Sequence, residues 1–141
     1  MQPVMDVAAL EAFLAREFPQ VGDDFVIETV APMAVRVRMQ VAERHLRPGG
    51  TVSGPSMFAL ADVGTYLAVL AMIGPRALAV TTNCAIDFMR KPAAGQDLIC
   101  EARLLKLGRV LAVGDALIFS EAMEAGAVAR ASLTYSIPPN R

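Results

Sequence analysis

One acidic residue interrupts the longest apolar stretch of the sequence. Asp62 is the only charged residue between Arg47 and Arg76. A carboxylate among apolar side chains costs free energy unless it is paired or hydrogen-bonded, and ionisable groups in such settings are frequent at active sites. Asp62 is therefore a candidate nucleophile or general base. The alternative is a carboxylate that caps a neighbouring backbone group or lies at a solvent edge.

The residues before this stretch form a helix-start motif, Ser53-Gly54-Pro55. Serine and glycine are frequent N-cap residues, and proline is tolerated in the first turn because the N–H that it lacks would be unpaired there anyway. The free N–H groups and the dipole of a helix start favour negative charge, so the Gly54 N–H could stabilise an oxyanion. The alternative is plain capping without a catalytic role.

The spacing of these two candidates indicates more than one subunit. Gly54 and Asp62 are eight residues apart, about 12 Å along a helix axis. One carbonyl carbon cannot contact both on the same helix, because reacting groups must approach to about 3 Å. If both act, they come from two subunits related by a two-fold axis. The hydrophobic fraction of 55% is above the ~45–50% of usual soluble domains, which also favours a subunit interface that completes the burial.

Polar residues later in the chain could complete such a site. Thr81 and Asn83 are expected on one strand face with Asp87, where they could position water for Asp62. The alternative is that these residues only satisfy the packing preferences of a β-strand. Cationic residues at strand ends and turns could bind phosphate groups or could simply be solvated. They are Arg90, Lys91, Lys106 and Arg109.

His45 is the only histidine in the sequence. A Ser-His-Asp triad is disfavoured, because neither Ser53 nor Ser56 lies in a nucleophile elbow. A pair between His45 and Asp62 stays open, and a structural histidine is the simplest interpretation.

The remaining pattern predicts one domain, residues 1–141, of the α+β class. Amphipathic periodicity predicts a helix at residues 6–18, and the stretch that ends at Gly74 predicts a buried helix. Its apolar part, residues 57–73, is shorter than the ~20 residues of a membrane span. Alternating residues predict strands at 25–30, 33–41, 78–89, 97–107, 110–121 and 127–137. A curved antiparallel sheet would wrap a helix that is apolar on all sides.

Charge and cysteine content exclude several classes of protein. The chain has 13 basic and 14 acidic residues without a basic stripe, which argues against a nucleic-acid partner. Cys84 and Cys100 are too few for a disulfide framework or a metal site, and they favour buried thiols in a reducing compartment. The first residues show no signal-peptide pattern. We therefore expect a cytoplasmic protein without a metal or redox cofactor.

Three segments resemble the hotdog-fold thioesterases of the PaaI-like group. Residues 49–62 resemble the start of the family's central helix, with Ser53-Gly54-Pro55 where the family has His-Gly-Gly and with Asp62 at its acidic position. Residues 82–92 resemble its strand that ends in Phe-x-Arg-Pro, and residues 105–121 resemble its next hairpin. The likeness runs from about residue 35 to residue 137. It implies a hotdog fold, with an antiparallel sheet around a long central helix, and dimers or tetramers with sites at the dimer interface.

The same resemblance implies hydrolysis of an acyl-CoA thioester, in which coenzyme A is part of the substrate. Asp62 would be nucleophile or general base, the Gly54 N–H of the partner subunit would polarise the carbonyl, and Thr81 would position water. Arg47 stands where many members have an asparagine beside the thioester. The residues expected to contact substrate are Arg47, Ser53, Asn83, Arg90, Lys91 and Arg109.

Two other functions on the same fold stay open. One is a non-catalytic module that binds acyl-CoA or an acyl carrier. The other is a hotdog dehydratase, which needs a histidine paired with an acid across the site. His45 precedes the predicted central helix and no histidine lies in a nearby strand, so the dehydratase is the less favoured of the two.

Overall fold

A long helix, α2 (Gly54–Ile73), runs through the middle of the molecule. The computed structural model describes residues 1–21, 23–122 and 126–139. Ser53 is the N-cap, and its hydroxyl accepts a hydrogen bond from the Ser56 N–H at 3.3 Å. Gly74 ends the helix with a φ of 97°, a left-handed conformation that glycine adopts without strain. Both ends of α2 therefore follow from local sequence, as predicted.

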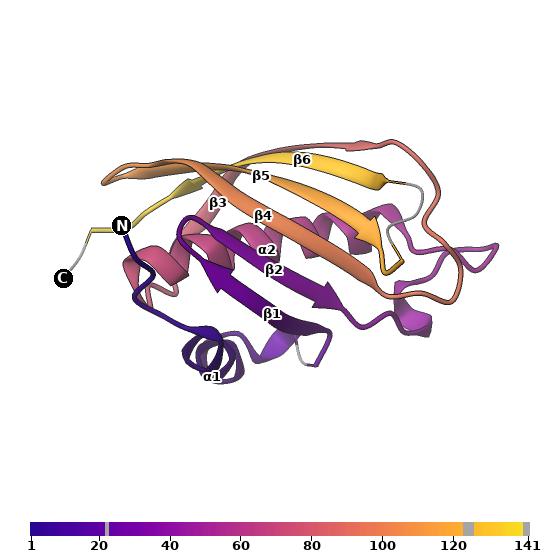
Figure 1. The fold of residues 1–141 in the computed structure, drawn as a ribbon, viewed down its shortest axis with the longest axis horizontal. Helices are drawn as coiled ribbons and strands as arrows, with labels where there is room; N and C mark the ends of the chain where they lie inside the picture. Colours follow the sequence, from indigo (N-terminus) through magenta and orange to yellow (C-terminus); the bar gives the residue numbers. More distant parts are fainter. Residues whose placement is uncertain (22, 123–125, 140–141) are drawn as a thin grey trace.

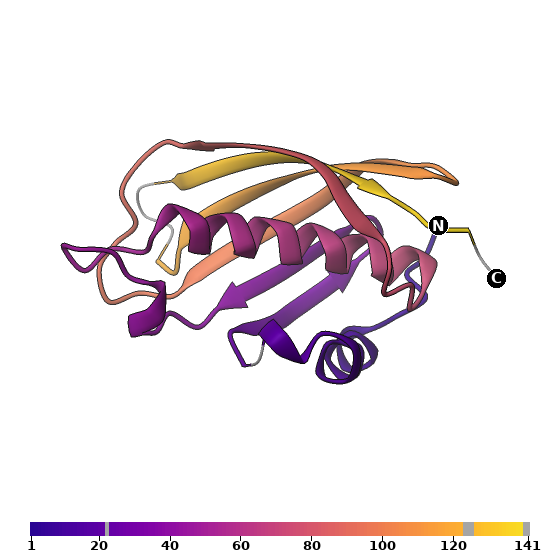
Figure 2. The ribbon, with the colours of Figure 1, turned by 180° about the vertical axis from the view of Figure 1, so that it is seen from behind.

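The side chains of α2 are buried along most of its length. By length and hydropathy alone this helix could cross a membrane. Most of its residues are instead buried within this chain, where the helix lies against the sheet (Figure 2), which confirms the predicted core helix. Its fully covered apolar residues are Leu60, Ala61, Leu67, Ala68, Val69 and Leu70.

Six antiparallel strands form the sheet that wraps α2 (Figure 1). They are β1 (Phe25–Ala31), β2 (Ala34–Met39), β3 (Val80–Phe88), β4 (Leu98–Leu107), β5 (Leu111–Ser120) and β6 (Ala127–Ser136). Their order in the sheet is β1-β2-β4-β5-β6-β3, so β1 and β3 are the edges. The predicted α+β hotdog architecture is confirmed. The strands begin and end within about two residues of the predicted positions. The small differences arise because neighbouring strands, rather than local alternation, decide where pairing stops.

The inner face of the sheet is apolar and packs closely on α2. In β6 the residues that alternate inward are buried, as the sequence predicts: Ala129, Ala131, Leu133 and Tyr135. The approach is tight at Gly64 of α2, where an added Cβ would lie only 2.9 Å from the Sγ of Cys100 in β4. Glycine at this position is what lets the central helix and the sheet come this near.

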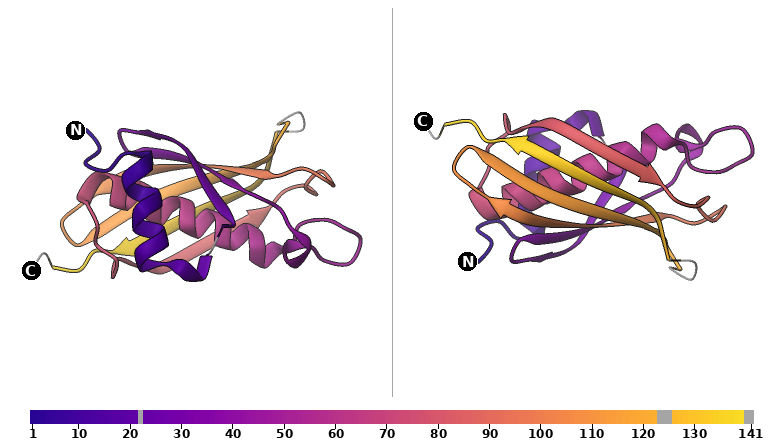
Figure 3. Two further views of the ribbon diagram at one scale, coloured as in Figure 1. Left: turned by 90° about the horizontal axis from the view of Figure 1, so that it is seen from below. Right: turned by 90° about the horizontal axis from the view of Figure 1, so that it is seen from above.

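A second helix, α1 (Val7–Glu17), packs beside β1 and α2 (Figure 3). Asp6 caps it by accepting a hydrogen bond from the Ala9 N–H at 2.9 Å. Its buried residues are Leu10, Phe13 and Leu14. Two short 3₁₀ turns, η1 (Pro19–Val21) and η2 (Glu43–His45), occur where no helix or strand was predicted.

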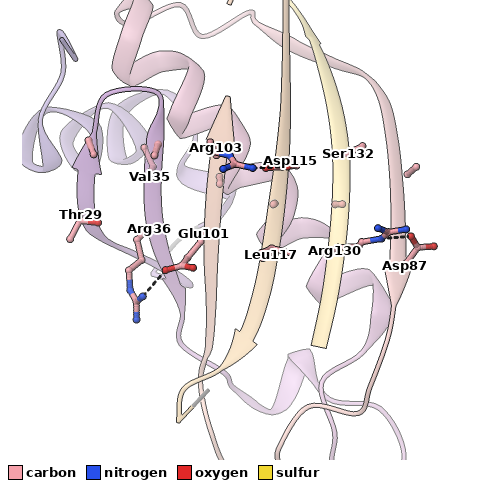
Figure 4. Close-up of a pocket in the computed structure, with 16 residues that line it drawn as sticks. Thr29, Val35, Arg36, Asp87, Glu101, Arg103, Asp115, Leu117, Arg130 and Ser132 are labelled. Carbon is pink, nitrogen blue, oxygen red and sulfur yellow. Dashed lines mark hydrogen bonds and ion pairs between the residues drawn. The ribbon is translucent and has the colours of Figure 1, made fainter. Parts of the chain in front are cut away.

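The outer face of the sheet carries charged residues that pair with one another (Figure 4). Arg36 binds Glu101 at 3.0 Å, and Arg130 binds Asp87 at 2.9 Å. These groups line a shallow hollow of about 650 Å³. None of the described residues that line it is a predicted site residue. Exposed ion pairs of this kind contribute little to stability, so we interpret this face as solvated surface.

Candidate active site

The side chain of Asp62 is held by two hydroxyl groups on the inner face of the sheet. The Thr81 hydroxyl donates to Oδ1 of Asp62 at 2.5 Å. The Tyr135 hydroxyl lies 2.6 Å from the same oxygen and 2.8 Å from the backbone carbonyl oxygen of Asp62. Among the described residues, none donates a hydrogen bond to Oδ2. Hydrogen bonds therefore fix Oδ1, and Oδ2 is available to react with a bound molecule.

Strand pairing explains why both hydroxyls reach the same carboxylate. Thr81 of β3 and Tyr135 of β6 are direct cross-strand partners. Directly opposed residues project from the same face of a sheet, which here is the face that packs on α2. Asp62 is in the third turn of α2, eight residues after Gly54. The sequence predicted Asp62 and Thr81 for this site but not Tyr135.

Thr81 and Asn83 do not share a strand face, and that prediction was wrong. The register of β3 against β6 shifts between them, so that Thr81 pairs with Tyr135 while Asn83 pairs with Thr134. The extra residue is a β-bulge, which reverses the alternation of the residues after it. Asn83 is exposed and shares the orientation of Thr134, away from Asp62. In this chain it cannot position water for Asp62.

Asp62 lies where two cavities meet. One, of about 390 Å³, includes Thr81 and Tyr135 in its wall. The other, of about 370 Å³, extends toward the start of α2 and includes His45 and Ser56. Phe18 lies in the walls of both. The carboxylate is thus half-buried but reachable from open space.

Gly54 opens onto a different cavity, of about 740 Å³. Arg47, Arg90 and Lys91 lie in the wall of the same cavity. The structure therefore brings two of the predicted phosphate-binding side chains, Arg90 and Lys91, together with the predicted substrate contact Arg47 to the N-terminus of α2, where the helix dipole also favours negative charge. The predicted contact residue Ser53 adjoins them, and its hydroxyl caps the helix.

Arg109 is not part of this cationic group. It lies in the turn between β4 and β5, which is at the opposite end of the sheet from the start of α2 (Figure 1). Within one chain, the structure therefore separates Arg109 from Gly54.

His45 is engaged by groups other than Asp62. Its Nδ1 accepts a hydrogen bond from the Ala42 N–H at 2.8 Å, and its Nε2 lies 3.1 Å from a carboxylate oxygen of Asp24. Burial, together with the nearby charge of Arg44, lowers the pKa of His45. Neutral imidazole with Nε2 protonated satisfies both contacts. The histidine therefore orders the loop before α2.

Other chemistry at this site is limited by the residues present. Within the described part of the chain, no three His, Cys, Asp or Glu side chains gather closely enough to hold a metal ion. Burial raises the pKa of the Cys84 thiol, and the carboxylate of Asp62 raises it further. A thiol with a raised pKa is a poor nucleophile near neutral pH, which leaves Asp62 as the best-placed reactive group.

Comparison with known proteins shows the family of the chain. The model of the thioesterase superfamily matches residues 49–127, which hold Gly54, Asp62 and Thr81. The chain belongs to the thioesterase superfamily. It is a thioester hydrolase, and the predicted resemblance to this family is confirmed.

Individual relatives in the superfamily cover most of the chain. Human acyl-coenzyme A thioesterase 13 is 30% identical over 99 residues, or 70% of this chain and 69% of that protein. The crystal structure of a Silicibacter protein described as a thioesterase is 61% identical and has a TM-score of 0.91, covering 99% of this chain and 96% of that one. A variant of the phenylacetic acid degradation protein PaaI of Thermus thermophilus is 27% identical with a TM-score of 0.72, covering 85% and 99%.

Sequence analysis missed Tyr135, although one signal for it was present. The alternation of residues 127–137 placed Tyr135 inward among apolar side chains. A buried tyrosine hydroxyl normally has a hydrogen-bond partner, so a partner on the central helix could have been expected. Which residue it would be depends on strand register.

Proposed function

We propose that this thioester hydrolase cleaves acyl-CoA, with Asp62 as nucleophile or general base. The observation that carries the proposal is that the hydrogen bonds to the Asp62 carboxylate involve only one of its two oxygens. Thr81 and Tyr135 bind Oδ1, and Oδ2 lies without a donor from the described residues beside open space. The similarity to an acyl-coenzyme A thioesterase supports a CoA thioester as substrate.

Either form of the chemistry uses the same oxygen. As general base, Oδ2 takes a proton from water while the water oxygen bonds to the thioester carbon; the C–S bond then breaks, and the departing thiolate takes up the proton. As nucleophile, Oδ2 itself bonds to that carbon and expels the thiolate, and water cleaves the resulting anhydride. A single turnover in water of heavy oxygen tests for the second form, because label in the Asp62 carboxylate would identify the anhydride.

The exposed edge of β3 supports a homodimer. Its side away from β6 has no partner strand in the part of the chain that the structure describes. Val80 and Phe88 at its two ends are 56% and 51% exposed. Long edge strands with apolar ends are normally covered, because they invite pairing with another chain. We infer that a second copy covers this edge.

Antiparallel pairing of two β3 strands would complete the site. Within one chain, Thr81 near the start of β3 binds Asp62, and Phe88 at its end packs against Gly54. A two-fold axis through the middle of β3 would bring Thr81 beside Phe88 of the partner subunit. Asp62 would then face Gly54 of the partner subunit, whose N–H can stabilise the oxyanion. This arrangement removes the obstacle of their separation along one helix.

The cationic cavity at the start of α2 is suited to the phosphates of coenzyme A. Arg47, Arg90 and Lys91 surround the same opening as Gly54. Guanidinium and ammonium groups form charge-assisted hydrogen bonds to phosphate.

Conversion of Asp62 to asparagine tests the proposal. Asp62→Asn retains an oxygen for Thr81 and Tyr135 to bind, but it cannot attack carbon or take up a proton. We expect release of free thiol from acyl-CoA to fall roughly 10²–10⁴-fold, with the size of the assembly unchanged. Asp87→Asn is the matched control, because Asp87 is on the same strand as Thr81 but pairs with Arg130 on the outer face.

Full thioesterase activity of Asp62→Asn would contradict the proposal. A wild-type protein that binds acyl-CoA tightly without turning it over would instead identify a binding module. The dehydratase has no support from the geometry, since both ring nitrogens of His45 are engaged by Ala42 and Asp24.

A further inference from the structure

The phenol of Tyr135 is placed to act on Asp62 rather than on a bound molecule. Its hydroxyl contacts both Oδ1 and the backbone carbonyl oxygen of Asp62. Only 2% of Tyr135 is exposed, so a substrate would meet the carboxylate first. We propose that Tyr135 is a positioning residue that fixes the Asp62 side chain with Oδ2 facing the reacting carbonyl. The inference rests on the proposed role of Asp62.

The contact with two atoms of one residue is what makes Tyr135 a positioning group. An aspartate side chain can turn about the bonds on either side of its Cβ. A hydroxyl that bonds the side chain alone would follow it as it turns. The Tyr135 oxygen lies 2.6 Å from the side chain and 2.8 Å from the main chain of Asp62, so it ties the carboxylate to the backbone of α2 and restricts both rotations.

The ring of Tyr135 is fixed by packing against other aromatic side chains. It stacks on Tyr66 with ring centroids 6.1 Å apart and an interplanar angle of 27°. The Tyr66 hydroxyl donates to the carbonyl oxygen of Ala77 at 3.0 Å. Phe13 and Phe18 pack against the other sides of Tyr66, with centroids 6.3 and 6.2 Å away. The aromatic cluster therefore links α1, α2 and β6 and leaves the phenol little freedom to move.

Tyr135 remains a hydrogen-bond donor throughout the range in which an enzyme works. Burial raises the pKa of its hydroxyl, and the negative charge of Asp62 raises it further. The hydroxyl therefore stays protonated and cannot act as a base. Tyr135 therefore acts as a fixed donor that orients the Asp62 carboxylate.

Thr81 and Tyr135 both bind the Asp62 carboxylate, but they differ in their exposure to solvent. Thr81 is half-buried on an edge strand beside the cavity, where its oxygen can also contact water. Tyr135 is enclosed by β5 and β3 on either side. Loss of Thr81 would change both the carboxylate and its solvent, whereas loss of the Tyr135 hydroxyl would change the carboxylate alone.

The test is Tyr135→Phe, which keeps the ring stack and removes one oxygen. We expect kcat to fall about 10- to 100-fold with KM changed less than about threefold, because geometry and not affinity is lost. Thermal melting shows whether the variant is folded, and assays run well below its midpoint.

Tyr66→Phe is the matched control for a purely structural effect. It also removes one buried hydroxyl from the aromatic cluster, but that hydroxyl binds Ala77. It should lower the melting temperature with a much smaller loss of kcat than Tyr135→Phe shows. Wild-type kcat in Tyr135→Phe would overturn the inference, and so would an equal loss of kcat in Tyr66→Phe.

Asp62→Asn separates this inference from the proposed function. An inactive Asp62→Asn with an unaffected Tyr135→Phe would overturn the positioning role alone. An active Asp62→Asn would overturn both, because Tyr135 would then have no catalytic carboxylate to position.

Discussion

The ring of Phe88 lies against the first residue of the central helix, where a Cβ added to Gly54 would come within 3.3 Å of the Phe88 Cζ. This contact joins the end of β3 to the start of α2 within one chain. It also leaves the Gly54 N–H beside the cationic cavity. In the proposed dimer, the same corner faces Asp62 of the partner subunit.

A methyl group at this corner should impair catalysis more than folding. In Gly54→Ala, the ring of Phe88 must move by a few tenths of an ångström, and it can do so because it is half exposed. We expect the free energy of unfolding to change by less than about 0.5 kcal/mol. We expect kcat/KM to fall on the order of tenfold, because small displacements of an oxyanion donor are costly.

The double variant Gly54→Ala with Phe88→Leu controls for crowding. The smaller side chain gives the added methyl room, so part of the lost kcat/KM should return. Steady-state kinetics and urea denaturation on all variants measure the two effects separately. Undiminished activity in Gly54→Ala would contradict the expected displacement of the helix-start amide.

Gly64 sets how closely the sheet can approach the central helix. In Gly64→Ala, the new Cβ would lie 2.9 Å from the buried Sγ of Cys100. Overpacking of this kind costs about 1–3 kcal/mol, and the better helix propensity of alanine returns about 1 kcal/mol. We therefore expect a net loss of roughly 1 kcal/mol in the free energy of unfolding, measured by urea denaturation.

Cys100→Ala in the same background should reverse that loss. Removal of the sulfur leaves space for the new methyl group, so the two substitutions should be less damaging together than the sum of each alone. Strict additivity in the double-mutant cycle would show that helix and strand move apart freely at this point.

Cross-linking through Cys84 tests the proposed pairing of β3 with its counterpart. A two-fold axis near the middle of β3 brings the two Cys84 residues close together, since opposed Cα atoms of antiparallel strands are about 4.5–5.5 Å apart. A short bis-maleimide should therefore produce covalent dimers on a denaturing gel. The reaction is run at alkaline pH, because burial and Asp62 raise the pKa of this thiol.

Cys84→Ser is the control, and it should abolish the cross-link. Cys100 is fully buried and should not react in the folded protein. A dimer in solution that resists cross-linking at Cys84 would show that another surface joins the subunits, and a monomer would remove the shared site altogether.

The sequence by itself determined the elements and the central acid. Ser53 and Gly74 delimit α2, alternation in residues 127–137 shows which side of β6 is buried, and Asp62 stands out because its surroundings are apolar. These features depend on neighbours along the chain, through capping, backbone conformation and a two-residue period. For that reason they could be predicted without knowing what packs against them.

The tertiary structure alone decided which polar groups meet. The bulge between Thr81 and Asn83 turns one inward and the other outward, and the pairing of β3 with β6 brings Tyr135 to Asp62. Likewise Asp24, and not Asp62, is the acid that engages His45. Register and bulges are settled by the pairing of whole strands, and a shift of one residue reverses every face, so no local pattern could have fixed them.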